Sequence, residues 1–325
     1  MIISPQSRIL IAGLFLLLLL CPLSGNGRPP IVANELISIY ADPPLEAFAL
    51  GLEDPLTAKI NALFQELGVY PDTPADFFIV SGKKAYQELT TGKGKIVEHS
   101  DAFYSPHEKR IYIRSPEQVT ENYLKILLHE YIHWYIDYIF GTAPLWFHEG
   151  MAVQYAQQLG MDRYYHFIRS RFWGEKLNLN EMYFRYPATK SDWDLYYLTS
   201  AFAIKYMRDE HPEAWQKFWT MAARVLRYSE LHNTGMRQGF SNVFFYAYGL
   251  SANAFSTGFD SYTRRLGYQY LFMGFNALLL GFLPFILIIA YFKRRSRMKR
   301  MPEYPEPVEQ EEPDADLPGG EEEPV

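Results

Sequence analysis

The sequence contains very little cysteine: Cys21 is the only one in 325 residues. A domain built from later residues therefore has no disulfide and depends on its core for stability. The net charge is −6, with no sign of the clustered basic face that nucleic-acid binding requires, so nucleic acid is not an expected partner. No internal repeat occurs between the two ends. The chain does have ample core material, since 48% of residues are hydrophobic and 17% aromatic.

The N-terminus has the pattern of an export signal. Residues 9–20, ILIAGLFLLLLL, follow Arg8 and precede the small-residue segment CPLSGNG. A short apolar run between a positive charge and small residues is typical of a secretory signal peptide. Residues 1–27 are therefore expected to be a signal peptide or, if uncleaved, an N-terminal anchor. Lipidation of Cys21 is a further alternative, although Leu20 stands where a lipoprotein signal has a small residue.

A second apolar run lies near the C-terminus. Residues 271–292, LFMGFNALLLGFLPFILIIAYF, carry no charge and are enough to cross a hydrocarbon core of ~30 Å. The cluster KRRSRMKR follows, and the positive-inside rule keeps it in the cytoplasm. We expect a transmembrane helix over 269–292, a domain of residues 28–268 outside the cytoplasm, and a cytoplasmic tail over 293–325 that is basic, then acidic and disordered. A bacterial inner membrane fits this arrangement best.

The pattern within 28–268 predicts an α+β domain, because short strands precede a series of helices. FFIV at 77–80 is expected to be a buried strand, and KRIYIR at 109–114 alternates like a half-exposed strand. The apolar periodicity predicts helices over 55–68, 83–89, 122–140, 145–160, 196–211 and 211–226.

The helix expected at 122–140 contains HEYIH at residues 129–133. Positions i and i+4 lie on the same helix face, so His129 and His133 can direct two imidazoles at one metal ion. Glu130 lies about 100° around the helix, within reach of a water molecule beside that ion. This spacing predicts a zinc site with two histidine ligands and a general base.

A catalytic zinc normally takes a third protein ligand. Asp137 continues the histidine stripe, but three residues along one helix do not easily converge on a point, which favours a supporting role for it. GTAP at 141–144 breaks the helix, and an antiparallel return of the next one would bring Glu149 opposite the histidines. His148 is the alternative ligand. Its neighbour Trp146 and the Glu-Gly pair favour the glutamate.

HEYIH followed by APLWFHEGMAVQYA resembles the gluzincin zinc metallopeptidases, and most of all the bacterial peptidase-MA-like families, over residues 123–160. The resemblance implies a zincin-like fold, in which a small sheet with the active-site helix precedes a helical subdomain. It further implies that Zn²⁺ is held by His129, His133 and Glu149, with Glu130 as the general base.

The resemblance continues more weakly through LYYLTSAFAIKYM. Tyr197 occupies the family's Tyr-x-x-Ser position and would stabilise the developing oxyanion, with Tyr196 as the alternative. Val153 stands where the thermolysin-like branch has an aspartate, so the supporting partners of that branch are not carried over. In zincins an edge strand pairs with the substrate; which strand of residues 101–114 forms it, or whether KRIYIR only completes the sheet, stays open.

These features predict a membrane-anchored zinc metallopeptidase that hydrolyses a peptide or protein substrate outside the cytoplasm. Glu130 would take a proton from the attacking water and return it to the leaving amine. The alternative is a non-catalytic, zincin-fold module that binds protein at the membrane, against which the intact Glu130 weighs. A hydrolase acting on small soluble substrates is a third reading.

The first prediction concerns topology. Six of the eight residues in 293–300 are Lys or Arg, and moving this cluster across a bilayer costs far more than leaving it inside. Protease added to spheroplasts should therefore digest residues 28–268 and spare an epitope placed after Val325. Protection of the domain together with loss of that epitope contradicts the predicted orientation.

Overall fold

The structure is a computed structural model that describes residues 29–300 apart from 92–99, 161–163, 165, 168, 171, 173–176, 188, 190–191 and 233–238. The expected signal peptide or anchor, Cys21 and the acidic tail lie outside the described residues. The chain divides into two compact units, with the boundary between Gln269 and Tyr270.

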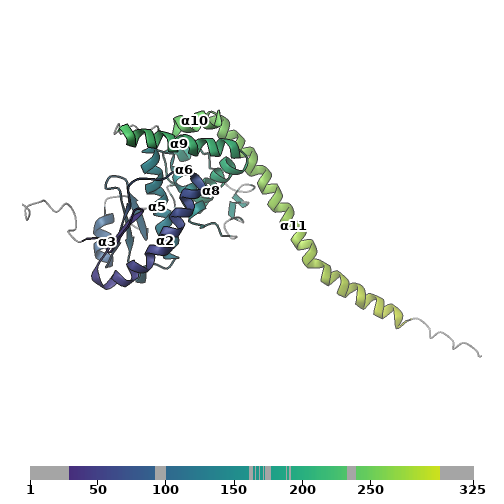
Figure 1. Ribbon diagram of the computed structural model, residues 1–325. Coiled ribbons are helices and arrows are strands. Elements are labelled where there is room, and N and C mark those ends of the chain that lie inside the picture. The colour runs from purple at the N-terminus through teal and green to yellow at the C-terminus, as the bar shows by residue number, and fades with distance from the viewer. Residues whose placement is uncertain are drawn as a thin grey trace, which may run out of the picture. The chain divides into compact units, whose positions relative to one another are not determined.

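A five-stranded sheet forms the N-terminal part of the first unit (Figure 1), in the order β1-β2-β3-β5-β4. β2, β3 and β5 are parallel, whereas β1 and β4 pair antiparallel at the two ends. The strands are β1 (Val32–Ala33), β2 (Ile37–Ala41), β3 (Ala75–Val80), β4 (Ala102–Ser105) and β5 (Arg110–Arg114). Together with the helices that follow, this sheet confirms the predicted α+β class.

Helices cover both faces of the sheet because β3 alternates its side chains between them. Phe77 stacks on Tyr131 of α5 (Tyr123–Phe140), with ring centroids 6.3 Å apart. Phe78 faces the other way, into an aromatic cluster with Tyr86 of α3 (Lys83–Thr90), Phe103 and Tyr112.

Two expectations for this half are wrong. KRIYIR is not half-exposed: β5 has a partner on each side, and Ile111, Tyr112 and Ile113 are all buried. The edge strand beside it is β4, which the pattern did not reveal. The helix expected from residue 55 also begins earlier, since α2 spans Glu46–Leu67 with Pro55 inside it, and it ends as expected at Gly68, whose φ is +69°.

The helix that carries HEYIH is bounded by local signals. The Asn122 side chain accepts a hydrogen bond from the Lys125 backbone N–H at the start of α5, and Gly141 closes its end with φ +69°. The next helix, α6 (Leu145–Tyr155), was expected to reach residue 160. It stops earlier because Gln157 takes a positive φ of 55°, which turns the chain out of the helix.

The remaining helices of the domain surround an aromatic core. They are α8 (Trp193–Asp209), α9 (Pro212–His232), which starts at its proline as expected, and α10 (Phe240–Tyr248). Short 3₁₀ turns span Pro43–Leu45 (η1), Pro116–Gln118 (η2) and Glu181–Tyr183 (η3). The core joins α5, α6, α9 and α10 through ring contacts among Phe140, Phe147, Phe218, Trp219 and Phe240.

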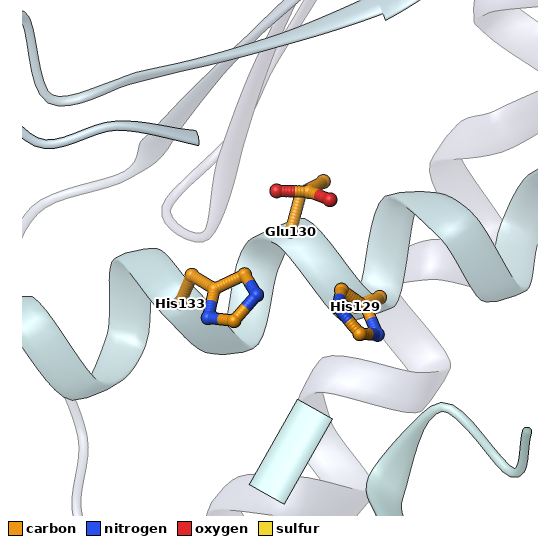
Figure 2. A group of neighbouring side chains, drawn as sticks. All are labelled: His129, Glu130 and His133. Carbon is orange, nitrogen blue, oxygen red and sulfur yellow. The ribbon is translucent and has the colours of Figure 1, made fainter. Parts of the chain in front are cut away.

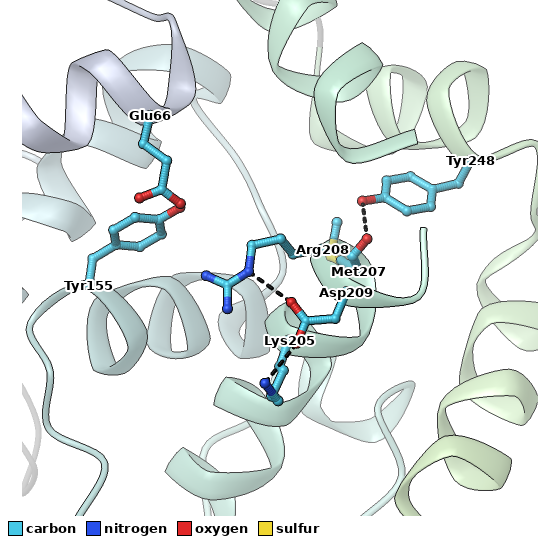
Figure 3. Close-up of polar contacts among 7 residues, drawn as sticks. All are labelled: Glu66, Tyr155, Lys205, Met207, Arg208, Asp209 and Tyr248. Atoms are coloured by element: carbon cyan, nitrogen blue, oxygen red, sulfur yellow. Dashed lines mark hydrogen bonds and ion pairs between the residues drawn. The ribbon is translucent and has the colours of Figure 1, made fainter. Parts of the chain in front are cut away.

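Polar contacts tie the two halves of the domain together (Figure 3). The Tyr155 hydroxyl at the end of α6 donates to Glu66 of α2 over 2.7 Å, and Arg208 of α8 interacts electrostatically with both. On the other side of α8, the Tyr248 hydroxyl donates to the Met207 carbonyl over 3.2 Å. The C-terminal ends of α2, α6 and α8 are therefore linked.

α6 and α8 pack closely at Gly150. A Cβ atom added there would lie 2.3 Å from the Ser200 carbonyl oxygen and 2.7 Å from Ile204 Cγ1. Only glycine allows this approach, because the nearest atom is backbone on α8 and cannot move aside cheaply. The glycine of the Glu-Gly pair noted in the sequence thus allows α8 to pack against α6 at the residue that follows Glu149.

The final helix, α11, spans Ala252–Met298. Its first turns carry buried residues of the domain core, among them Phe255, Phe259 and Tyr262. It is long and apolar enough to cross a membrane, and its most apolar 18-residue window is exposed throughout. This is the one candidate span among the described residues, and it includes the expected run.

Gly150→Ala should destabilise the domain by about 1–3 kcal/mol, because the added methyl group overpacks the contact with α8. Gly51→Ala is the matched control: Gly51 also lies in a helix, and its added Cβ would meet nothing within 4 Å. That change should be neutral or stabilise the helix by about 0.5–1 kcal/mol. Thermal unfolding of both variants checks this, and equal stability would contradict the close packing.

Candidate metal centre

α5 presents the three polar residues of HEYIH on neighbouring sides of one helix turn (Figure 2). The two imidazoles of His129 and His133 lie one turn apart, with ring centroids separated by 4.9 Å. Glu130 leaves the helix in a different direction from them. One potential ligand atom from each of the three residues falls within a 4.8 Å group, so the structure contains a His-Glu-His cluster that can bind a metal ion.

Glu149 of α6 approaches the histidines more closely than that limit. Its Oε2 lies 3.5 Å from His129 Nε2 and 3.7 Å from His133 Nε2. Tetrahedral ligands with bonds of 2.0–2.1 Å are separated by about 3.4 Å, and both distances from Glu149 Oε2 are close to that separation. Oε2 is buried and has no hydrogen-bond partner among the described residues. Glu149 is thus a second carboxylate, beside Glu130, that lies close to both histidines.

The other nitrogen of His129 is occupied. Nδ1 lies 2.9 Å from Oε1 of Gln158, which can only accept, so Nδ1 carries the proton. In the neutral imidazole Nε2 then presents a lone pair toward Glu149, and a cation or a shared proton between these two acceptors would remove their repulsion. The turn at Gln157 places Gln158 there, and Lys125 Nζ donates to the Gln157 carbonyl over 2.8 Å.

The second oxygen of Glu149 is held from the opposite side. The Tyr186 hydroxyl donates to Glu149 Oε1 over 3.0 Å. Burial and the Glu149 charge raise the pKa of Tyr186 well above its ordinary value, so the hydroxyl remains a donor. With Oε1 engaged, Oε2 is left to face the histidines. Such outer contacts fix the orientation of metal ligands.

Electrostatics at the centre favour positive charge. Burial alone would raise the pKa of Glu149, but His133, His129 and Tyr186 outweigh it and lower the value to about 2. Burial likewise opposes a charge on His129, yet Glu149 and Glu130 raise its pKa overall. A buried carboxylate that stays ionised beside two imidazoles is a setting suited to a divalent cation.

Glu130 has a separate environment. Burial raises the pKa of its carboxyl to about 7, partly offset by His129. Tyr104, on the edge strand β4, supplies a backbone hydrogen bond to it. A carboxyl group with a pKa near 7 can exchange protons at physiological pH. Glu130 lies between the histidines of α5 and the edge strand β4.

Asp137, for which a supporting role is expected, has partners away from the histidines. Its Oδ2 accepts a hydrogen bond from the Tyr104 hydroxyl over 2.6 Å and forms an ion pair with Lys109. Lys109 has a positive φ of 58° in the β4–β5 turn. Asp137 therefore fastens the edge strand to α5. This is the supporting role expected of it.

Three more expected residues are placed by the structure. His148 lines the cavity beside the centre, with its ring 5.7 Å from that of His133, and burial lowers its pKa to about 4. Tyr197 lines the same cavity, with its ring 6.3 Å from that of His129. Tyr196 is directed elsewhere, since its buried hydroxyl donates to the Met182 carbonyl over 3.1 Å.

The cavity has a volume of about 610 Å³ and runs from the centre along β4. Its lining combines Glu130, Glu149 and the three histidines with Ala102, Phe103 and Tyr104 of the edge strand, and with Tyr183, Phe184, Tyr186, Trp193 and Tyr197. An opening of this size, beside the end strand of the described sheet, has room for an extended chain.

Sequence reasoning did not identify Tyr104, Gln158 or Tyr186 as parts of the site. Each comes from a segment that the periodicity left undefined or placed in the wrong element. Only Gln158 had a local signal: it belongs to QQLG at residues 157–160, whose glycine is typical of the end of a helix. The other two are brought to the site by contacts between distant parts of the chain.

Neither a scan against protein-family models nor a search of curated proteins finds a match for this chain. Its function is therefore inferred from the geometry and chemistry of these side chains.

Glu149→Ala should abolish stoichiometric zinc binding by the full-length protein, as should His129→Ala and His133→Ala, because each removes one of three converging donors. Asp137→Ala is the control and should retain about one zinc per chain. Metal analysis after dialysis measures both. Retention by Glu149→Ala combined with loss in Asp137→Ala would reverse the ligand assignment.

A graded effect is expected at Gln158. Gln158→Ala should keep zinc but bind it about 10–100-fold more weakly, because His129 loses the contact that fixes its tautomer. Gln157→Gly, one residue away, should leave the affinity unchanged, since glycine accepts the positive φ without strain. Competition with a chelator measures both affinities.

Proposed function

We propose that the chain is a membrane-anchored zinc metallopeptidase whose domain acts outside the cytoplasm, as its resemblance to the peptidase-MA-like gluzincins implies. The observation that carries the proposal is the buried Glu149 Oε2, which faces two imidazole nitrogens and lacks any other partner among the described residues. Two histidines and one carboxylate form a donor set used by catalytic zinc in peptidases.

His129, His133 and Glu149 would hold the ion. Zinc bound there supplies a Lewis acid that polarises a carbonyl oxygen and lowers the pKa of an adjacent water molecule. The protein's own groups then handle protons and orientation. Gln158 and Tyr186 keep the ligands aimed at one point, as their contacts with His129 and Glu149 indicate.

Glu130 is the proposed base. Its carboxyl accepts a proton from the attacking water at one Oε atom and returns it to the amine of the departing peptide. The raised pKa near 7 suits both halves of this exchange. A module that only binds protein has no use for a buried carboxyl in this position, which favours catalysis over the non-catalytic alternative.

Substrate orientation would come from β4 and Tyr197. The β4 edge faces the cavity and can pair with an extended peptide through main-chain hydrogen bonds. Tyr197 lines the same cavity, and its hydroxyl would donate to the carbonyl oxygen as negative charge develops there. The edge strand left open by the sequence is thus β4, not KRIYIR.

The proposed location follows from the chain's charges. α11 supplies a candidate span, and the basic residues 293–300 favour the cytoplasmic side for its C-terminal end. The domain would then lie in the periplasm or outside the cell.

Glu130→Gln should retain zinc and fold but lose turnover by about 10²–10⁴-fold, because an amide cannot accept the proton. Tyr197→Phe should also retain zinc and lose about 10²–10³-fold. Hydrolysis of a generic peptide library by the full-length protein measures both.

Tyr196→Phe is the matched control for the second change, since its hydroxyl contacts Met182 outside the cavity. It should cost little activity. Parent-like turnover in Glu130→Gln would end the proposed mechanism. An active Tyr197→Phe with an inactive Tyr196→Phe would transfer the donor role to Tyr196.

A further inference from the structure

Four aromatic side chains line the cavity and are here called the aromatic wall: Phe184, Tyr186, Trp193 and Tyr197. Starting from the metal centre, the Tyr197 ring lies 6.3 Å from His129, Trp193 lies 5.4 Å from Tyr197, and Tyr186 stacks on Trp193 at 5.2 Å. All four line the same cavity.

The outer member of the wall is unusually exposed. Phe184 is 82% accessible, although its neighbour Tyr183 is anchored by a 2.9 Å hydrogen bond with Ser241 and contacts it ring to ring at 4.3 Å. Single exposed apolar side chains are common, whereas apolar surface shared by several residues along a cavity marks a binding groove. The wall is also supported rather than loose, because Tyr186 is tied to Glu149.

Charge in the cavity is concentrated at the centre. No Lys or Arg is among the described residues that line it, and the Lys109 ammonium near its end is paired with Asp137. Apart from Glu130 and Glu149, Asp137 is the one carboxylate in that described lining, and the same ion pair engages it. The described lining therefore offers a peptide terminus no charged partner outside the proposed catalytic groups.

We propose that the aromatic wall is a specificity subsite for a large apolar or aromatic side chain of an extended peptide, bound within the chain rather than at its end. This rests on the proposed function for the identity of the cleaved bond. The occupant is a peptide because the wall faces a cavity that also contains the β4 edge. Main-chain pairing on β4 would leave a side chain free to cover the wall.

The subsite supplies selectivity through burial. A phenylalanine side chain that covers the wall removes apolar surface from water on both partners, whereas alanine leaves Phe184 and Trp193 largely uncovered. Burial of one such ring corresponds to a difference in affinity of about 10–100-fold. Tyr197 is shared between the wall and the proposed chemistry, which places the selected residue next to the cleaved bond.

Binding is tested separately from turnover. The full-length Glu130→Gln protein, in lipid nanodiscs with zinc present, is titrated with two fluorescent peptides whose termini are acetylated and amidated and which differ only in one Phe or Ala. We expect the Phe peptide to bind about tenfold or more tightly. Adding Phe184→Ala should reduce this ratio several-fold, and adding Trp193→Ala should do the same.

Phe245→Ala is the control, because Phe245 is also an exposed phenylalanine, at 57%, but does not line this cavity. It should leave the Phe-to-Ala ratio unchanged. Equal binding of the two peptides, or a ratio that survives both wall substitutions, overturns the subsite. The parent protein is assayed for cleavage of the same peptides. A preserved binding ratio without cleavage would overturn the peptidase proposal and leave the aromatic subsite standing.

Discussion

A carboxylate buried to the extent of Glu149, which is 4% exposed, stays ionised only where positive charge or strong donors surround it. One of its oxygens accepts from the Tyr186 hydroxyl, and the other lies near two imidazole nitrogens and has no hydrogen-bond partner in the described part of the chain. This arrangement is stable when a cation or a shared proton lies between the three groups. Three parts of the chain meet this electrostatic requirement together: α5 supplies the two histidines, α6 supplies Glu149, and the segment before α8 supplies Tyr186.

α6 contributes to the site at both of its ends. Near its start it supplies Glu149, and the following Gly150 allows α8 to approach within contact of the backbone. Just after its end, the positive φ of Gln157 directs Gln158 to the far side of His129. Backbone strain of this kind is retained where surrounding structure stabilises it, and here it places Gln158 Oε1 against His129 Nδ1.

The edge strand β4 is attached to α5 at two points through a single residue. The Tyr104 backbone bonds to Glu130, and its hydroxyl bonds to Asp137 two turns further along the helix. The strand that would receive substrate is therefore coupled directly to the residue that would act as base. On the opposite side of the cavity, the aromatic wall is fastened to α6, because Tyr186 donates to Glu149.

Several features could be predicted from local sequence, because they depend on spacing along one element. The α+β class, the helix that carries HEYIH, the common face of His129 and His133, and the apolar run of α11 all follow from periodicity and composition. Boundaries set by a single backbone conformation could not be predicted with the same certainty: Gln157 ends α6 early, and Pro55 lies inside α2. Residues 109–114 alternate like an exposed strand, yet tertiary packing covers both faces of β5. Glu149 could be expected opposite the histidines, because a break at residues 141–144 lets the next helix return antiparallel. The contacts of Tyr104, Gln158 and Tyr186 were decided only by the tertiary structure, because these three residues reach the site from separate segments. Their convergence depends on three tertiary features at once: the close contact at Gly150, the packing of the aromatic core and the neutralisation of a buried charge. The periodicity of a single segment carries no information about contacts with other segments.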